Sequence, residues 1–368
     1  MDLKQTLIMP RRSMLKLSGA ALATLAAPSI IRSARAADKL TVFSWETYHL
    51  DPWIKEWTEK TGIEVNVVLT GSADEMYAQM AAGSIEPDVI IVDSGNLKRH
   101  VDSNFIAPLD VSKIPNASYV AKGFNFEKRN AIDGKIYGIP YNWGVQPLMF
   151  ARSVGEEGMD TWNALWDKRF AGKVNLFDDG YATIPMIAMK AGAKDPYNLT
   201  EDEFAAVVEA LKELRPQVGS ISRGPSDQTA IFAAGDALVG YCMVVNSVFT
   251  LNADGQNKFG YSFPKEGTLG WIDNAAVTPR GERDASYQFI SDILAPDWQA
   301  RFVASAQTNG VLSTADARKA GLSDEVLHKT TILDQDTPGF WEKLSVFSPP
   351  EDIERRVQIW NDFKAGTL

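Results

Sequence analysis

The sequence predicts an α/β protein of two domains, each a mostly parallel sheet flanked by helices. Three observations support this prediction: the length, an alternation of strand-like and helix-like segments, and short apolar runs such as Asp88-Val-Ile-Ile-Val. A chain of 368 residues exceeds the roughly 100–200 residues of one domain. A strand that is buried on both faces is apolar throughout, as in parallel sheets. Alternating strands and helices place the helices on both faces of such a sheet.

The first 36 residues are predicted to be an export signal. Arg11 and Arg12 precede Ser-Met-Leu-Lys, an apolar run follows over residues 17–30, and Ala34-Arg-Ala36 is a small-x-small cleavage site. The paired arginines resemble the twin-arginine export motif, and an ordinary secretory signal with two chance arginines is the alternative. The apolar run is shorter than the roughly 20 residues of a membrane span. No cysteine lies near the cleavage site, so neither an anchor nor a lipoprotein is expected.

The next segments alternate regularly between strand and helix patterns. Strands are predicted over residues 40–44, 63–69 and 88–92, and helices over residues 52–60 and 74–82. In the first of these helices Trp53, Ile54 and Trp57 share one face, as a helix packed on a sheet requires.

The same style resumes in the second half of the chain. Strands are predicted over residues 173–177 and 237–245, and helices over residues 200–214, 285–294, 298–306 and 351–364. Thr200 with Glu203 three residues later is a capping box. No long linker separates the halves, so the domains are expected to be joined by short crossovers, for which residues 140–146 and 271–276 are the candidates.

Composition narrows the function. The first 36 residues hold six of the 37 basic residues and one of the 47 acidic residues, so residues 37–368 carry 31 basic and 46 acidic ones, a net charge of −15. This charge argues against nucleic acid as a partner. It is compatible with a cationic ligand, although solubility alone explains most of it. Cys242 is the single cysteine, so no intrachain disulfide forms, and we expect it to be a small buried apolar residue.

Motifs for catalysis and for cofactors are absent. The chain contains no G-x-G-x-x-G, G-x-x-x-x-G-K-[ST], H-E-x-x-H or G-x-S-x-G pattern. Its three histidines, His49, His100 and His328, have no neighbour at metal-ligand spacing. We therefore expect no enzyme, no catalytic residue, no metal and no cofactor.

A series of motifs carries a family resemblance. In chain order these are Phe43-Ser-Trp-Glu-Thr-Tyr48, Tyr77-Ala-Gln-Met80, Asp88-Val-Ile-Ile-Val-Asp-Ser94, Tyr137-Gly-Ile-Pro-Tyr-Asn-Trp-Gly144, Thr161-Trp-Asn-Ala-Leu-Trp166, Phe170-Ala-Gly-Lys-Val174, Leu176-Phe-Asp-Asp179, Phe263-Pro-Lys-Glu-Gly267 and Trp271-Ile-Asp273. The series resembles the spermidine/putrescine-binding periplasmic proteins of ABC importers, from about residue 38 to the C-terminus.

The resemblance implies the two-lobed type II periplasmic-binding fold, in which the lobes close on ligand about short hinge crossovers. Lobe 1 is then expected to comprise residues 37–142 and 273–312, and lobe 2 residues 143–272 and 313–368. The expected role is that of a monomeric periplasmic receptor that passes a small amine to a permease in the inner membrane.

The resemblance also implies a set of ligand-binding residues. Trp45 and Tyr48 match an aromatic pair that lines the cleft, Asp179 matches a carboxylate that pairs with an amine, and Trp271 with Asp273 match a ring and an acid that grip a second amine. Charge-assisted hydrogen bonds and cation–π contacts give this pattern a physical reason. The full expected set is Trp45, Tyr48, Asp93, Ser94, Asp179, Trp271 and Asp273.

Some of these residues have a structural alternative. Trp45 suits the core of a lobe, and Asp179 suits the cap of the following helix. The apolar context of Asp273 favours a ligand contact, because a buried carboxylate without a partner is costly. Trp143 is expected to be a packing residue.

Three positions depart from the polyamine pattern. The family places a second acid where this chain has Ala182, a tryptophan where it has Val245, and serine and tyrosine where it has Asp93, Ser94 and Gly95. A shorter diamine, or an amine with a different tail, therefore fits better than a long triamine. The alternative ligand is a partly anionic amino compound held by Arg223, which is otherwise a solvated loop arginine.

Overall fold

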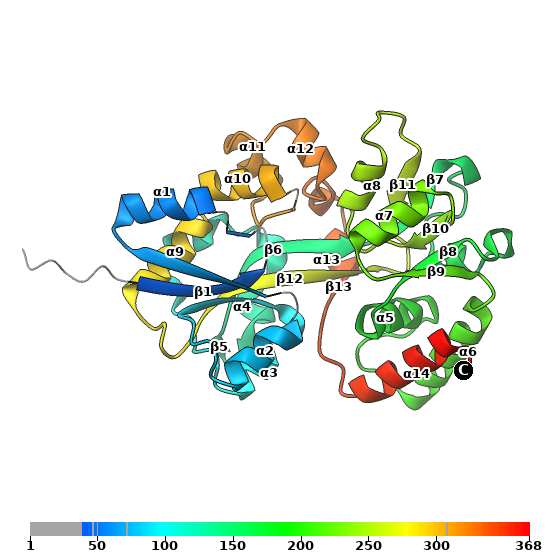
Figure 1. Cartoon of the computed structure of the whole chain (residues 1–368), viewed down its shortest axis with the longest axis horizontal. Helices are drawn as coiled ribbons and strands as arrows, with labels where there is room; N and C mark the ends of the chain where they lie inside the picture. The colour runs from blue at the N-terminus through cyan, green and yellow to red at the C-terminus, as the bar shows by residue number, and fades with distance from the viewer. Residues whose placement is uncertain (1–38, 46–47, 50, 71–72, 307) are drawn as a thin grey trace, which may run out of the picture. The chain divides into compact units, whose positions relative to one another are not determined.

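Two large sheets organise the described part of the chain (Figure 1). The structure, a computed structural model, describes residues 39–45, 48–49, 51–70, 73–306 and 308–368. The predicted export signal in residues 1–36 lies outside the described residues.

The first sheet has six strands in the order β13-β12-β3-β1-β2, with β6 also paired to β12. Their bounds are β1 (Lys39–Trp45), β2 (Glu64–Thr70), β3 (Val89–Asp93), β6 (Ile139–Gln146), β12 (Thr268–Val277) and β13 (Leu344–Val346). The predicted parallel pairing is confirmed for β1 with β2 and with β3. In contrast, β12 runs antiparallel to β3 and β6, because β6 leads the chain out of this sheet and β12 brings it back.

The helices of this first lobe are α1 (Asp51–Thr61), α2 (Ala73–Ala81), α3 (Ser94–Asp102), α4 (Phe126–Arg129), α9 (Asp284–Ile293), α10 (Pro296–Ala306), α11 (Thr314–Lys319), α12 (Asp324–Lys329) and α13 (Phe340–Lys343). A short hairpin of β4 (Ala131–Ile132) and β5 (Lys135–Ile136) accompanies them. The predicted face of α1 is buried through Trp53, Ile54 and Trp57, and each such side chain contributes roughly 1.5–3 kcal/mol.

The second sheet has the order β11-β7-β10-β8-β9 and forms the second lobe with its helices. Its elements are β7 (Leu148–Ala151), β8 (Val174–Phe177), β9 (Val218–Ser222), β10 (Val239–Tyr241), β11 (Phe259–Ser262), α5 (Gly180–Lys190), α6 (Glu201–Leu214), α7 (Pro225–Ala233), α8 (Asn246–Leu251) and α14 (Ile353–Ala365). The predicted capping box of α6 is confirmed, since Thr200 and Glu203 each bind the other's backbone N–H.

The described chain passes between the two sheets at Pro147, at residues 263–267 and at residues 347–352. The predicted crossover segments 140–146 and 271–276 are parts of β6 and β12, which pair side by side in the first sheet (Figure 1). The predicted lobe boundaries at 142/143 and 272/273 fall within these two strands. The predicted boundary at 312/313 lies just before α11, which contacts α10 of the first lobe. The exact lobe boundaries stay a prediction.

One predicted element is shorter than expected. The apolar run over residues 237–245 forms a strand only at Val239–Tyr241, because the Gln228 side chain then takes over the backbone partners: it donates to the Tyr241 carbonyl and accepts from the Met243 N–H. Cys242 is fully buried, as predicted, and burial raises the pKa of its thiol to about 12.

Candidate functional site

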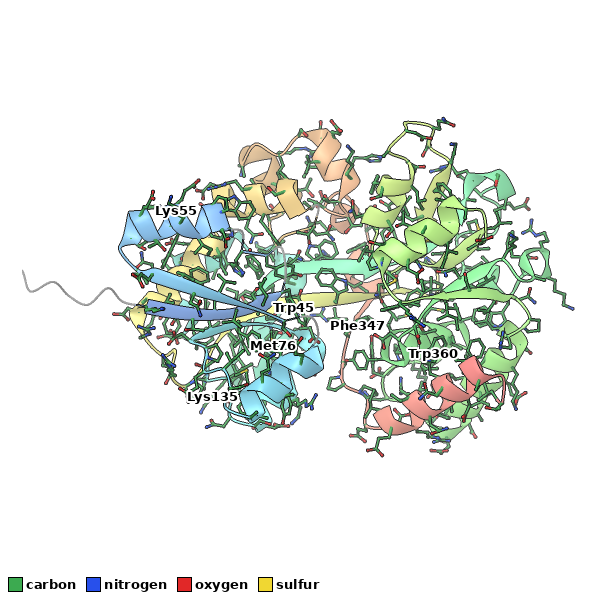
Figure 2. All side chains as sticks on the ribbon, viewed as in Figure 1. Trp45, Lys55, Met76, Lys135, Phe347 and Trp360 are labelled. Carbon is green, nitrogen blue, oxygen red and sulfur yellow. The ribbon has the colours of Figure 1, made fainter. Side chains whose placement is uncertain are left out.

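A cavity of about 400 Å³ lies where the two lobes approach each other. This acidic cavity is lined by Trp45, Tyr48, Ala73, Asp93, Asn96, Asp179, Tyr181, Trp271, Asp273 and Phe347. Ligand sites usually enclose about 300–1,000 Å³. Six of the seven residues expected from the sequence are in this lining, and Figure 2 shows Trp45 and Phe347 near each other where the lobes meet.

Asp273 is the most buried of the acidic residues in the lining, with 6% of its surface exposed. It lies on β12 directly opposite Asp93 on β3. The Tyr48 hydroxyl donates to it at 2.5 Å. Burial raises the pKa of Asp273 to about 8, the Tyr48 hydrogen bond lowers it, and the charge of Asp93 raises it further. The pKa of Tyr48 is raised well above its ordinary value, mainly by burial and then by Asp273.

Asp93 ends β3 and caps the N-terminus of α3. Its carboxylate accepts from the backbone N–H of Asn96 at 3.1 Å and from the side-chain amide of Asn96 at 2.9 Å. Burial raises the pKa of Asp93, while these Asn96 hydrogen bonds oppose the shift. The cap therefore holds the carboxylate at the wall of the acidic cavity.

Asp179 enters the acidic cavity from the second lobe. It caps α5, accepting from the Tyr181 N–H at 2.8 Å. Both interpretations of Asp179 from the sequence are thus compatible, since it caps the helix and also lines the cavity. The neighbouring Asp178 faces elsewhere, where it accepts from Trp360 and Lys364 of α14.

Two glycines allow rings to approach the backbone at this site. The ring of Trp271 lies so close over Gly144 of β6 that a Cβ at that position would collide with it. In the same way, a Cβ at Gly95 of α3 would collide with the hydroxyl of Tyr181 from α5. Gly95 and Tyr181 are therefore a close contact between the two lobes.

The expected residue Ser94 does not line the acidic cavity. Its hydroxyl donates to the Ile272 carbonyl at 3.1 Å and accepts from the Asn274 side-chain amide at 3.0 Å. It thus ties α3 to β12 behind the cavity wall. Trp143 is almost fully buried against Phe124, Phe340 and Trp341, as a packing residue should be.

Arg223, the residue of the alternative hypothesis, is exposed and lines neither the acidic cavity nor a second cavity that adjoins it and is described below. Its backbone N–H donates to Asp227. Burial acts to raise the pKa of Asp178, but hydrogen bonds from Lys364 and Trp360 lower it, and the charge of Arg223 lowers it further. Asp178 lies outside the lining of the acidic cavity. Nothing in the position of Arg223 favours an anionic ligand group.

Sequence reasoning missed four residues in the lining: Ala73, Asn96, Tyr181 and Phe347. Asn96 and Tyr181 follow Asp93 and Asp179 within one helical turn, so helix periodicity offered a signal for them. Phe347 follows the edge strand β13, and no local pattern marks it.

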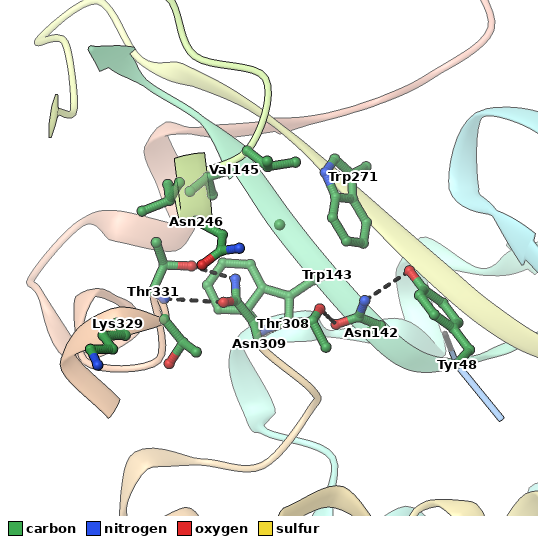
Figure 3. A pocket seen from close by; sticks show the side chains of 14 residues that line it. Tyr48, Asn142, Trp143, Val145, Asn246, Trp271, Thr308, Asn309, Lys329 and Thr331 are labelled. Carbon is green, nitrogen blue, oxygen red and sulfur yellow. Dashed lines mark hydrogen bonds between the residues drawn. The ribbon is translucent and has the colours of Figure 1, made fainter. Parts of the chain in front are cut away.

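A second cavity of about 260 Å³ adjoins the first (Figure 3). This amide cavity is lined by Tyr48, Asn142, Trp143, Gly144, Val145, Val244, Val245, Asn246, Trp271, Thr308, Asn309, Lys329, Thr330 and Thr331. Tyr48 and Trp271 belong to both linings. Asn142 connects the two cavities chemically, because its amide donates to the Tyr48 hydroxyl while its carbonyl accepts from Thr308 and from the Gly310 N–H.

Within the described residues, no group of three or more His, Cys, Asp and Glu side chains is arranged to hold a metal ion. The same part of the chain includes no helix with the length and apolar character of a membrane span.

Comparisons with known proteins agree with this architecture. The family model of bacterial extracellular solute-binding proteins matches residues 52–329. The spermidine/putrescine-binding periplasmic protein 1 of Haemophilus influenzae is 27% identical over 254 residues, which cover 67% of each chain. The putrescine-binding periplasmic protein SpuD of Pseudomonas aeruginosa is 24% identical over 364 residues, which cover 94% of each chain.

Among solved structures, the spermidine/putrescine ABC transporter substrate-binding protein PotD of Streptococcus pneumoniae superposes with a TM-score of 0.77. The superposition covers 90% of this chain and 100% of that one at 19% identity. The predicted two-lobed type II periplasmic-binding fold is thereby confirmed.

Proposed function

The chain belongs to the family of bacterial extracellular solute-binding proteins, and from this premise we propose that it binds putrescine or a related small organic cation in the acidic cavity and delivers it to an ABC importer. Members of this family bind solutes without transforming them, so the chain is a binding protein and not an enzyme. The names of its relatives, which bind spermidine or putrescine, support an amine as the ligand.

One observation carries the proposal: Asp93, Asp179 and Asp273 converge from both lobes on one cavity whose described lining contains no Lys, Arg or His. Burying the charge of Asp273 is costly, and burial raises the pKa of this carboxyl to about 8. An ammonium group relieves that cost through charge-assisted hydrogen bonds. A ligand with one or two ammonium groups is thus the complementary solute.

The aromatic residues complete this complementarity. Trp45, Tyr48 and Trp271 offer flat walls for a methylene chain, and each ring face attracts a cation by roughly 0.5–2 kcal/mol. We propose that these three rings and the three acids contact the ligand. Ser94 is proposed to support the wall, since its hydroxyl is engaged by Ile272 and Asn274.

The finer biology is also a proposal. We propose that the protein leaves the cytoplasm by the twin-arginine route, on the strength of Arg11 and Arg12, and works as a periplasmic monomer with a permease of the inner membrane. The net charge of −15 over residues 37–368 argues against nucleic acid as a partner.

A thermal-shift screen with calorimetric titration tests the ligand class. Putrescine, cadaverine, spermidine, a quaternary amine and a neutral amino acid are compared as ligands. An amine at 100 times its dissociation constant should stabilise the protein by about 2.7 kcal/mol. Stabilisation by the amino acid with none by any amine would overturn the proposal.

A further inference from the structure

The amide cavity differs from the acidic cavity in charge. Its described lining contains three asparagines, three threonines and no carboxylate. Its one charged residue is Lys329, at the opposite end from Trp271 (Figure 3). A second ammonium group in this cavity would have no acidic partner and would face a like charge. The two cavities therefore suit chemically different ends of one molecule.

Lys329 is not a strong anchor for an anion. Its Nζ lies 2.6 Å from Oε1 of Glu325, and 49% of the lysine side chain is exposed. An anionic tail would have to compete with Glu325 and with water for this ammonium. The lining thus favours an uncharged tail.

The polar groups of this cavity are partly committed to one another. Asn309 and Thr331 are paired through two hydrogen bonds, and Asn142 is held by Tyr48, Thr308 and Gly310. Of the three asparagines in the described lining, Asn246 is the one whose side-chain amide has no hydrogen bond within the described residues. Figure 3 shows this amide directed toward Asn309 and Thr331, inside the cavity.

The two cavities share a wall that one ligand can follow. The ring of Trp271, lying over Gly144, borders both cavities. The Tyr48 hydroxyl stands between Asp273 on the acidic side and Asn142 on the amide side. A methylene chain lying along Trp271 would therefore lead from Asp273 into the amide cavity, whose lining includes Asn246.

We propose that the solute is a primary amine whose other end is an uncharged hydrogen-bonding group, an N-acylated diamine being the simplest example. Its ammonium lies among Asp93, Asp179 and Asp273, and its acyl amide lies in the amide cavity, where Asn246 offers both a donor and an acceptor. The inference rests on the proposed amine-binding function and names the class of amine. A site built to hydrogen-bond one group discriminates strongly against a ligand that lacks it.

Calorimetric titration with three matched probes tests the inference: N-acetylputrescine, putrescine and 4-aminobutanoate, whose tails are neutral, cationic and anionic. The wild-type protein should bind N-acetylputrescine at least tenfold more tightly than either of the others. Asn246→Asp keeps the shape of the side chain and adds a negative charge. The variant should therefore bind N-acetylputrescine more weakly and putrescine more tightly than the wild type, so that the preference for N-acetylputrescine is reversed or lost. Asn66→Asp adds the same charge on the exposed face of β2 and should change neither affinity.

The outcomes separate the inference from the function on which it rests. If the wild type binds putrescine more tightly than N-acetylputrescine, and Asn246→Asp changes neither affinity, the proposal of a neutral tail is wrong. The proposed function as an amine receptor would then still stand. If 4-aminobutanoate binds most tightly of the three probes, the inference of an uncharged tail is also wrong, and the ligand has an anionic tail. No binding of any amine would overturn the proposed function itself. Asn246→Leu removes both hydrogen-bonding groups. It should lower the affinity for N-acetylputrescine about tenfold and the affinity for putrescine less than twofold.

Discussion

The Tyr48 hydroxyl donates a 2.5 Å hydrogen bond to Oδ2 of Asp273, although 225 residues separate them in the chain. The same hydroxyl accepts from Asn142 on β6. One phenol thus links the segment after β1 to the paired strands β6 and β12, from which the chain crosses into the second lobe. Burial raises the pKa of Asp273 to about 8, so at neutral pH this site favours a proton or a bound cation.

Replacing Asp273 with Asn should be the most damaging single change of a carboxylate. The variant keeps the shape and removes the charge, and breaking a buried charged contact costs roughly 2–5 kcal/mol of binding free energy. Asp179→Asn should cost less, because Ala182 leaves that end of the cavity without a second acid. Asp93→Asn should cost about as much as Asp179→Asn if Asp93 replaces that acid. Calorimetric titration with the best amine ranks the three variants.

The matched control is Asp102→Asn, which removes an exposed carboxylate of the same lobe that pairs with Lys98. It should leave affinity unchanged. An Asp273→Asn protein that folds and binds amine with wild-type affinity would refute the cation-gripping model.

Amine affinity should rise with pH between about 6 and 8. Below its raised pKa of about 8, Asp273 is largely protonated in the free protein, so cation binding must expel a proton. Affinity then changes by up to about tenfold per pH unit, since one pKa unit is about 1.4 kcal/mol. Titration at pH 7 in buffers of different ionisation enthalpy should reveal proton release, and Asp273→Asn should abolish it. Affinity that stays flat across this range in the wild type would contradict the burial argument.

The same carboxyl fixes the sign of a stability effect. The pKa of Asp273 is raised in the folded state, so the folded protein binds more protons than the unfolded chain between about pH 4 and pH 8. The free energy of unfolding of the free protein should therefore fall as pH rises through this window. Burial also raises the pKa of Asp93, in the same direction. Urea unfolding at a series of pH values should show a shallower fall for Asp273→Asn.

The cleft residues could be predicted where they follow a strand that the local pattern already predicts. Trp45 and Asp93 end β1 and β3, and the ends of parallel strands meet at one edge of a sheet. Asp273 was accessible through its apolar context and the motif it shares with the polyamine-binding proteins. The amide cavity was not predictable in this way, because Asn246, Thr308 and Thr331 come from three distant segments without a common pattern.

The pairing of the strands could be predicted only in part from the sequence, because the paired strands also come from distant segments. The apolar runs at β1 and β3 predict buried strands, but periodicity does not fix their neighbours. The antiparallel pairs of β12 with β3 and β6 join residues far apart in sequence. The early end of β10 depends on the distant side chain of Gln228.

Gly144→Ala should weaken amine binding by displacing Trp271. The added methyl group would collide with the indole ring, and overpacking of this kind costs typically about 1–3 kcal/mol. Gly224→Ala is the matched control, because a Cβ at Gly224 meets no atom within 4 Å. Thermal unfolding and titration of both variants measure the effects, and equal affinities would show that the position of the ring does not matter for binding.

Replacing Arg11 and Arg12 with lysines should block export if the twin-arginine route is used. Lysine keeps the charge that an ordinary secretory signal needs, so the change separates the two routes. Cell fractionation and immunoblotting locate the protein, and N-terminal sequencing of the exported form should begin at Ala37. Export of the variant at wild-type levels would assign the ordinary secretory route.

Closure of the lobes should depend on Gly95 and Tyr181. A Cβ at Gly95 of α3 would collide with the hydroxyl of Tyr181 on α5, in the other lobe. Gly95→Ala should therefore hold the lobes apart and weaken the binding of the ligand. Small-angle scattering should show that the amine reduces the radius of gyration of the wild type and does so less in this variant. Adding Tyr181→Phe removes the colliding oxygen and leaves the ring carbon Cζ, which lies at 3.3 Å from that Cβ, so the double variant should recover much of the closure. Because such a rescue requires direct contact between the two positions, an unrescued double variant would mean that Gly95→Ala acts within α3 alone.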